Sequence, residues 1–583
     1  MRTAMWLIGL STVAIAAGAR LPQTPGEPAN AAGQTRAVDA ISLAPAALAP
    51  PNPLAAITSD RILAHVSALA ADQMEGRAPG TLGEERAVAY LADEFARMGL
   101  QPGNPDGTYV QRVPLIGFHG AATASFNVKG TRQPLQIPSD LIAVSRQGLA
   151  DVAVQDSDVV FVGYGVVAPE LGWDDFKNVD VRGKTLVMLV GDPPVPDPTN
   201  SQSLDPGTFG GAAMTYYGRW TYKYEIAAAR GAAAAILVHE TGPAGYPWDV
   251  VQSNYTRENL GIDAPGESTR HAPVDAWMTL DRAKKLFADA GLDYDRLKGQ
   301  AATRTFSPVP LSATASFTVK NTLRIIASRN VIAKLEGSDP VLKNEYVMYT
   351  AHWDSFGINP AAKGDQIMNG ALDNGSGMAV MLTMAEAFAR MPVRPKRSLL
   401  FLSPTAEEAT MLGAKYYAQQ PLWPLEKTLA DINMDIMNFW GRTHAIVSIG
   451  KSLTTLDEIL DAEAAKQGRV VRPDPEPEKG YFYRSDHFEL AKQGVPSLHF
   501  LHPGAEYLDQ PADYGQRKRD EYTTTAYHKP NDDVRADWDL RGAVEDAVLL
   551  FRIGLAVSEA TAYPEWRPGT EFRAIRAQRL GRK

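Results

Sequence analysis

Residues 346–354 read YVMYTAHWD, an apolar run followed at once by two chemically active side chains. The run from Tyr346 to Thr350 has the length and composition of a buried strand. His352 and Asp354 come directly after it. In open α/β sheets, functional side chains collect beyond the carboxyl ends of the strands, because the loops converge there. We therefore expect both residues at the functional edge of a sheet.

The alternation of strands and helices continues on both sides of this stretch. After Asn330, short apolar runs alternate with segments of helical periodicity, which is typical of an α/β fold. We predict strands at 330–335, 346–350, 398–402, 431–434 and 497–501, and helices at 376–391, 411–419, 453–466 and 539–557. The pattern predicts a three-layer α/β/α sandwich with a mixed sheet. Its main domain would be residues 306–583, with residues 56–150 as its N-terminal part.

Imidazole and carboxylate side chains follow the predicted strands or lie in the loops between the elements. They are His352, Asp373, Glu407, Glu408, Asp435 and His528. Any one of them alone is more often structural. Nitrogen and oxygen donors of this kind suit Zn²⁺, and their shared position after successive strands predicts a metal site.

Residues 151–305 do not share this alternation. Short β-type runs at 158–162 and 184–190 are separated by Gly and Pro turns. The segment resembles the protease-associated domain in its sequences GYG at 163–165, VRGK at 181–184 and AARGA at 228–232. This resemblance implies an inserted, β-rich protease-associated domain.

The N-terminus has the features of an exported protein. Arg2 precedes an apolar run, and Ala17-Gly18-Ala19 fits the small-residue pattern of signal-peptide cleavage. We predict a signal peptide at 1–19 and a flexible, Ala- and Pro-rich linker at 20–55. No later apolar segment reaches the roughly 20 residues that span a bilayer, so we expect no integral membrane segment after signal removal. A periplasmic or extracellular location follows.

Composition narrows the classes of partner. The formal net charge is -9, which offers no concentrated basic surface for a nucleic acid. The chain has no cysteine, so neither disulfides nor a lipid anchor on cysteine is possible. We expect no nucleic acid as partner and leave the oligomeric state open.

The ordered set His352, Asp373, Glu407-Glu408, Asp435, His528 resembles the zinc aminopeptidase and glutamate-carboxypeptidase family. This resemblance implies a phosphorylase/hydrolase-like α/β/α sandwich that binds two Zn²⁺ ions and hydrolyses peptides. It also implies that Asp373 bridges the metals, that His352 and Asp435 complete one site, and that Glu408 and His528 complete the other.

A metal-bound water also needs a base, and Glu407, the neighbour of a ligand, is the candidate. Asp354, two residues after His352, is the candidate acceptor that fixes the imidazole tautomer. The run Ser485-Asp486-His487 resembles another landmark of the family, near which a tyrosine binds the tetrahedral intermediate. The expected position holds Phe482, so Tyr481 or Tyr483 would have to serve.

Three alternatives to an aminopeptidase stay open. A carboxypeptidase would need Arg or Lys aimed at the free carboxylate of its substrate, and Arg484 and Arg442 are candidates. A related glutaminyl cyclase would use a single zinc ion. A receptor-like, non-catalytic relative would have lost ligands, whereas this chain keeps the whole set.

Overall fold

The computed structural model describes residues 52–200, 202–360, 362–501 and 505–582. The predicted signal peptide at 1–19 lies outside the described residues, as does the predicted linker up to residue 51. The linker prediction is wrong at its C-terminal end. There Pro53–Ala56 forms the short 3-10 helix η1, and Ala56 is buried in the core because it packs beside a helix of the main domain.

The fold is built on a long mixed sheet. Its strands pair in the order β19 (Val470–Pro473), β18 (Ala445–Ile449), β20 (Ser497–Leu501), β17 (Thr428–Asn433), β13 (Tyr346–Thr350), β16 (Ser398–Ser403), β12 (Val309–Leu335), β5 (Asp151–Phe161), β8 (Thr185–Leu189), β9 (Ala234–His239), β11 (Val274–Thr279) and β4 (Leu141–Val144). Strand β13 is parallel to both of its neighbours, whereas β12 is antiparallel to β16 and β18 is antiparallel to β20. The predicted mixed sheet is confirmed.

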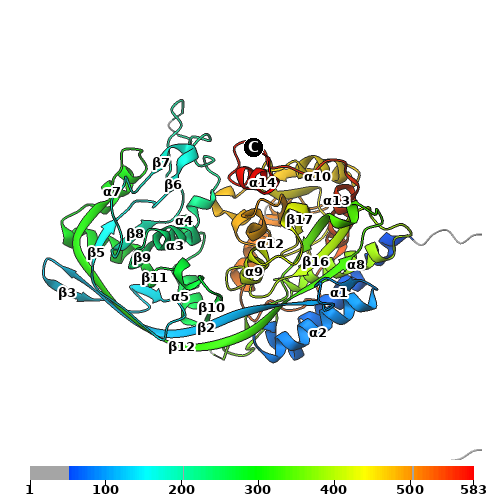
Figure 1. Cartoon of the computed structure of the whole chain (residues 1–583), viewed down its shortest axis with the longest axis horizontal. Helices are drawn as coiled ribbons and strands as arrows, with labels where there is room; N and C mark the ends of the chain where they lie inside the picture. The colour runs from blue at the N-terminus through cyan, green and yellow to red at the C-terminus, as the bar shows by residue number, and fades with distance from the viewer. Residues whose placement is uncertain (1–51, 201, 361, 502–504, 583) are drawn as a thin grey trace, which may run out of the picture. The chain divides into compact units, whose positions relative to one another are not determined.

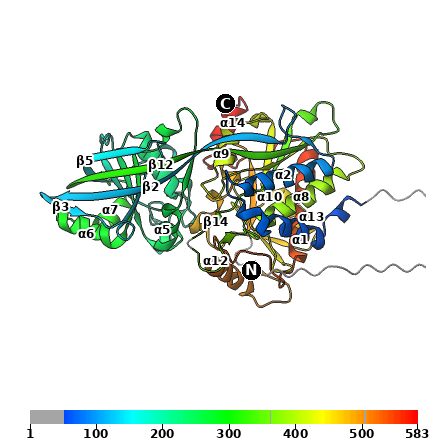
Figure 2. The same cartoon turned by 90° about the horizontal axis from the view of Figure 1, so that it is seen from below.

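Two helical layers cover the C-terminal part of this sheet. Successive side chains of a strand point to opposite faces, and β13 uses both. Val347 and Tyr349 pack with α1 (Ser59–Leu69), α2 (Leu82–Arg97), α8 (Gly375–Ala389) and α13 (Arg541–Glu559), which Figure 2 shows together. Tyr346 and Met348 pack with α9 (Leu412–Gln419) and α11 (His487–Ala491). The predicted three-layer sandwich is confirmed.

The two longest strands lead from this layer system into a second core. β2 (Val110–Val128) runs antiparallel to β12 along its whole length, from Val110 opposite Val331 to Val128 opposite Ala313 (Figure 1). Beyond them, β9 again buries both faces. One face packs on α6 (Leu280–Ala290) and α7 (Tyr294–Ala301), and the other on α3 (Trp220–Ala229).

The segment predicted as a β-rich insert differs from its prediction in two respects. It contains α3, α4 (Thr241–Ala244), α5 (Trp248–Thr256), α6 and α7 beside its strands, so it is mixed α/β. Its core also includes Phe126 and Phe317, which lie outside 151–305. The reason is that β2 and β12 are continuous and belong to both cores. Its protease-associated character stays a prediction.

The remaining elements are short or peripheral. The strands are β1 (Gln101–Pro102), β3 (Thr131–Pro134), β6 (Val167–Ala168), β7 (Trp173–Asp174), β10 (Asn259–Ile262), β14 (Gly357–Ile358) and β15 (Ile367–Met368). The helices are α10 (Leu456–Ala465), α12 (Tyr514–Thr525) and α14 (Arg573–Arg579). Of the helices in the described part of the chain, none is both long and apolar enough to cross a bilayer.

Candidate metal centre

Parallel strands bring most of the candidate ligands to one edge of the sheet. His352 follows β13, Glu408 follows β16 and Asp435 follows β17; these strands are parallel, so their carboxyl ends meet. Asp373 stands just before α8, and His528 follows α12. The structure therefore brings together all five residues predicted as metal ligands.

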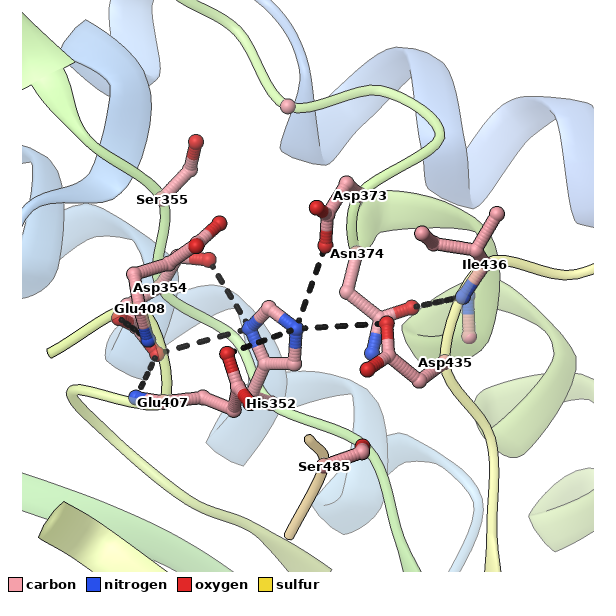
Figure 3. Close-up of polar contacts among 12 residues, drawn as sticks. His352, Asp354, Ser355, Asp373, Asn374, Glu407, Glu408, Asp435, Ile436 and Ser485 are labelled. Carbon is pink, nitrogen blue, oxygen red and sulfur yellow. Dashed lines mark hydrogen bonds and ion pairs between the residues drawn. The ribbon is translucent and has the colours of Figure 1, made fainter. Parts of the chain in front are cut away.

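These five side chains form two groups that share Asp373. Nε2 of His352 lies 3.4 Å from Oδ1 of Asp373 and 3.6 Å from Oδ1 of Asp435 (Figure 3). Nε2 of His528 lies 3.4 Å from Oδ2 of Asp373 and 3.3 Å from Oε2 of Glu408. Within each group the candidate ligand atoms all lie within 4.8 Å of one another. Asp373 therefore presents one oxygen to each group.

The donor atoms fit a metal ion. Nε2 of His352, Oε1 of Glu408 and Oδ1 of Asp435 are buried and have no hydrogen-bond partner within the described ranges. A buried polar atom without a partner costs free energy unless something else binds it. Each group offers one imidazole nitrogen and two carboxylates, and these are donors that zinc takes in proteins. The cluster is therefore suited to hold zinc.

The position of Asp373 follows from the cap of the next helix. Asn374 is the N-cap of α8, and its Oδ1 accepts the backbone N–H of Gly377 at 2.9 Å. Its Nδ2 donates to the carbonyl of Met434, directly before Asp435, at 2.9 Å. One capping side chain thus ties the loop of the shared carboxylate to the loop of another candidate ligand.

Asp354 lies where its predicted role requires. Nδ1 of His352, the ring nitrogen that faces away from the other candidate ligands, is hydrogen-bonded to the backbone carbonyl oxygen of Asp354 at 3.2 Å and lies 3.6 Å from its Oδ1. The same carboxylate accepts the backbone N–H of Glu407 at 3.0 Å and that of Glu408 at 3.4 Å (Figure 3). Asp354 therefore contacts both the imidazole and the loop after β16.

Glu407 faces the cluster but belongs to neither ligand group. Its Oε2 lies 3.9 Å from Nε2 of His352. Burial raises the pKa of Glu407 well above its ordinary value, and the carboxylates of Asp435 and Asp486 add to this effect. A carboxylate with a raised pKa beside a candidate metal site is suited to take up and release a proton.

For His352 and Asp373, the effect of neighbouring side chains on the pKa outweighs the effect of burial. Burial alone lowers the pKa of His352, but the carboxylates of Asp354 and Asp373 outweigh it and hold the pKa well above its usual range. Burial likewise raises the pKa of Asp373, but the neighbouring imidazoles of His352 and His528 bring it below the ordinary value. Asp373 is therefore ionised, as a shared ligand must be.

The structure does not bring Tyr481 and Tyr483 to the cluster. The hydroxyl of Tyr481 donates to Glu476 at 3.2 Å, and that of Tyr483 donates to Glu571 at 3.0 Å. Both rings lie in an aromatic core with Phe482. With both hydroxyls held by these carboxylates, their predicted contact with a reaction intermediate is not supported.

Two other residues that sequence reasoning missed lie beside the cluster. The ring of Tyr527 lies 3.8 Å from that of His528, and burial, Asp373 and Glu408 raise its pKa well above the ordinary value. Asp532 accepts the backbone N–H of Asp373 at 2.9 Å. Their position in the sequence could have indicated both residues, since each lies within four positions of His528.

A cleft of about 530 Å³ opens on Asp354, Ser355 and Glu408 and is lined on its other side by residues of the 220–260 segment. Arg257 is one of them. Its guanidinium carbon lies 5.4 Å from the ring centroid of Phe356, which in turn lies 4.5 Å from the ring of His528. The cleft therefore brings a cation of the predicted insert close to the candidate metal ligands.

The arginines predicted to meet a substrate carboxylate have partners elsewhere. Arg442 pairs with Glu545 at 2.5 Å, and Nη2 of Arg484 donates to the carbonyl of Lys479 at 2.6 Å. Neither residue lines the cleft that opens on Glu408. For a carboxylate-bearing substrate, Arg257 replaces them as the candidate.

Comparison with known proteins agrees with this geometry. Residues 330–552 match the sequence profile of Peptidase family M28. Aminopeptidase NAALADL1 of Mus musculus is 32% identical over 139 residues, which cover 23% of this chain and 17% of the mouse protein. Leupeptin-inactivating enzyme 1 of Streptomyces exfoliatus is 29% identical over 179 residues, covering 30% of this chain and 36% of that protein. The chain thus matches less than half the length of either relative.

Among solved structures, the aminopeptidase from Aneurinibacillus sp. strain AM-1 aligns with 89% of this chain and 97% of its own, at 17% sequence identity and a TM-score of 0.49. All five candidate ligands lie inside the segment that the family profile matches. Residues 330–552, a little over a third of the chain, are thus similar to Peptidase family M28.

Proposed function

We propose that the protein is a metallo-exopeptidase that holds two zinc ions and removes amino-terminal residues from peptides. The observation that carries this proposal is the position of Asp373, whose two oxygens each lie 3.4 Å from a different imidazole. A carboxylate shared in this way suits a pair of metals about 3.5–4 Å apart. His352 and Asp435 would complete one ligand set, and Glu408 and His528 the other.

Zinc bound at these residues would supply Lewis acidity toward the scissile carbonyl and would lower the pKa of water. Glu407 is in neither ligand group, so its carboxylate is available for proton transfer. We assign to Glu407 the removal of a proton from the attacking water and its delivery to the nitrogen of the leaving amine. Transfers of this kind typically contribute about 10²–10⁴ in rate.

Two further residues support this chemistry. Asp354 would hold His352 in the tautomer that leaves Nε2 free for a metal, because its backbone carbonyl lies 3.2 Å from Nδ1 and its carboxylate 3.6 Å from the same nitrogen. Tyr527 would donate a hydrogen bond from its phenol to the carbonyl oxygen as negative charge develops there, in place of Tyr481 or Tyr483. Its burial beside His528 and its raised pKa, which keeps the phenol protonated, support this assignment.

A carboxypeptidase is the one alternative to the aminopeptidase that a specific observation favours. The mouse relative is named an aminopeptidase, which supports removal of amino-terminal residues. Arg257 in the cleft is the observation that favours a carboxypeptidase, because a guanidinium can bind a substrate's free carboxylate. Peptides blocked at one end separate the two: an aminopeptidase cleaves the carboxyl-blocked set and leaves the amino-blocked set intact. The reverse pattern would overturn the aminopeptidase proposal.

Zinc content and turnover together separate the exopeptidase from a glutaminyl cyclase and from a receptor-like protein. A glutaminyl cyclase of this kind would hold a single zinc ion, and a receptor-like protein would hydrolyse nothing. Peptide hydrolysis by a chain that holds two zinc ions would therefore exclude both.

We also propose that the protein acts in the periplasm or outside the cell. The sequence pattern around Ala17-Gly18-Ala19 supports this location. Detection of the protein in a periplasmic or culture fraction, with its N-terminus after residue 19, tests it.

A further inference from the structure

Arg77 is a buried cation beneath the candidate metal centre. It belongs to the connector at 75–81 between α1 and α2, and its residue exposure is 1%. A buried guanidinium is costly unless its donors and its charge are both satisfied. The partners of Arg77 therefore indicate why it is there.

Four of its five N–H groups donate to backbone carbonyl oxygens. Nε donates to Trp353 at 2.8 Å, and Nη2 donates to Gly370 at 3.0 Å. Nη1 donates to Asn369 at 2.6 Å and to Leu69, the last residue of α1, at 2.5 Å. One planar side chain thus joins three separate segments of the chain.

Two of these segments carry candidate ligands. Trp353 directly follows His352, and Gly370 stands three residues before Asp373. Nε2 of His352 and Oδ1 of Asp373 lie 3.4 Å apart. A guanidinium that holds both loops by their carbonyls therefore constrains the separation of the imidazole and the shared carboxylate.

The connector at 75–81 also packs closely against the chain just before the Asp373 loop. Gly76 has a φ of +64°, and a Cβ there would lie 2.5 Å from the carbonyl oxygen of Gly357 and 2.6 Å from that of Met368. Glu75 and Arg77 also have positive φ values of 49°. Residues other than glycine rarely adopt this conformation and keep it where packing enforces it, often at functional sites.

The positive charge of Arg77 also interacts with the carboxylates of the cluster. Burial lowers its pKa to about 10, while nearby carboxylates raise it, so the group stays protonated at neutral pH. Those carboxylates are Asp354, Asp532, Glu408 and Asp373. The cation thus offsets part of the negative charge that the cluster gathers before any metal binds.

We propose that Arg77 is a positioning residue that holds the His352 loop and the Asp373 loop at ligating separation in the metal-free protein. The inference rests on the proposed zinc centre and extends it to a residue that binds no metal. It predicts that the loops are ordered before zinc arrives, and that zinc affinity depends on the guanidinium.

The test is calorimetric titration of zinc into chelator-stripped protein for wild type, Arg77→Lys and Arg77→Met. Replacing the groups that orient metal ligands typically weakens metal binding about 10–100-fold, and we expect a loss in that range for Arg77→Met. Arg77→Lys keeps the charge but not the planar fork, so we expect a smaller loss.

Arg576→Met is the matched control. Arg576 is also buried, and it donates to the carbonyls of Leu425 at 3.0 Å and Thr428 at 2.9 Å. Its loss should lower thermal stability but change the zinc dissociation constant by less than about twofold, as expected for a site outside the ligand loops. Equal zinc affinities in wild type and folded Arg77→Met would overturn the inference.

Hydrogen exchange on wild type covers the case in which the variants do not fold. The inference expects slow exchange at residues 353–357 and 368–373 in chelator-stripped protein, and fast exchange there that slows only with zinc would contradict it. The two proposals fail separately. Wild type that binds no zinc refutes the proposed function, whereas wild type that binds zinc as tightly as the Arg77 variants refutes this inference alone.

Discussion

The carboxylate of Asp354 accepts the backbone N–H of Glu407 at 3.0 Å. Asp354 follows β13 and Glu407 follows β16, so this hydrogen bond joins the loops of two adjacent parallel strands. The same carboxylate faces Nδ1 of His352. Asp354 therefore contacts both the candidate ligand His352 and the backbone of Glu407, the proposed proton carrier. The proposed mechanism requires that Glu407 itself does not bind a metal.

Glu407→Gln separates proton transfer from metal binding. Glutamine keeps the size of the side chain but cannot accept the proton, so we predict a fall in kcat of about 10²–10⁴ with zinc content unchanged. Steady-state peptide hydrolysis and elemental analysis of the same sample measure both. Glu336→Gln, at a partly exposed glutamate paired with Lys343, is the control and should keep full activity. A fully active Glu407→Gln enzyme would refute the assigned base.

Tyr527→Phe tests the proposed donor to the carbonyl oxygen. The variant keeps the ring beside His528 and loses the hydroxyl, so we predict about a 10²-fold lower kcat with little change in zinc affinity. Tyr481→Phe and Tyr483→Phe serve as paired controls, because their hydroxyls are bound to Glu476 and Glu571. If either control loses activity while Tyr527→Phe retains it, the assignment is reversed.

Arg257→Gln tests the direction of attack. An aminopeptidase does not need a cation for the far end of its substrate, so we predict that kcat/KM for carboxyl-blocked peptides stays within about threefold of wild type, a change under about 1 kcal/mol. Arg324→Gln is the control in the same cleft, because Arg324 is already paired with Glu258 at 2.6 Å. A loss confined to peptides with a free carboxylate would instead favour the carboxypeptidase.

Asp431 in β17 should make stability depend on pH. Burial raises its pKa to about 8, against an ordinary value near 3.8. Between these values the folded state holds a proton that the unfolded state has lost, so this group's contribution to the free energy of unfolding falls as pH rises from about 4 to about 8.

Asp431→Asn removes this titration. We predict that, relative to metal-free wild type, the variant gains up to about 4 kcal/mol of stability between pH 5 and pH 8. Thermal melts at both pH values measure it. Asp339→Asn is the control, because backbone hydrogen bonds lower the pKa of Asp339 and it stays ionised across this range. A difference between variant and wild type that does not change with pH would contradict the prediction.

The sequence was most informative where short-range pattern and function coincide. The predicted strand 346–350 has the bounds of β13, because an apolar run of that length is buried on both faces. The proximity of the five candidate ligands could be predicted because three of them follow parallel strands, whose following loops meet at one edge of the sheet.

Contacts between distant residues could not be predicted in the same way. Arg77 lies in a turn-rich connector, and its acceptors include Trp353 and Gly370, which are 276 and 293 positions away. Proximity to a motif points to Tyr481 and Tyr483, whereas their orientation depends on Glu476 and Glu571. The local sequence pattern does not show which distant residue a side chain contacts.

The zinc stoichiometry of the chelator-stripped wild-type protein tests the central claim most directly. Because Asp373 offers one oxygen to each ligand group, calorimetric titration should show two zinc ions bound per chain, and peptidase activity should return as they bind. Saturation at one zinc ion per chain, or no binding at all, would contradict the shared-carboxylate centre.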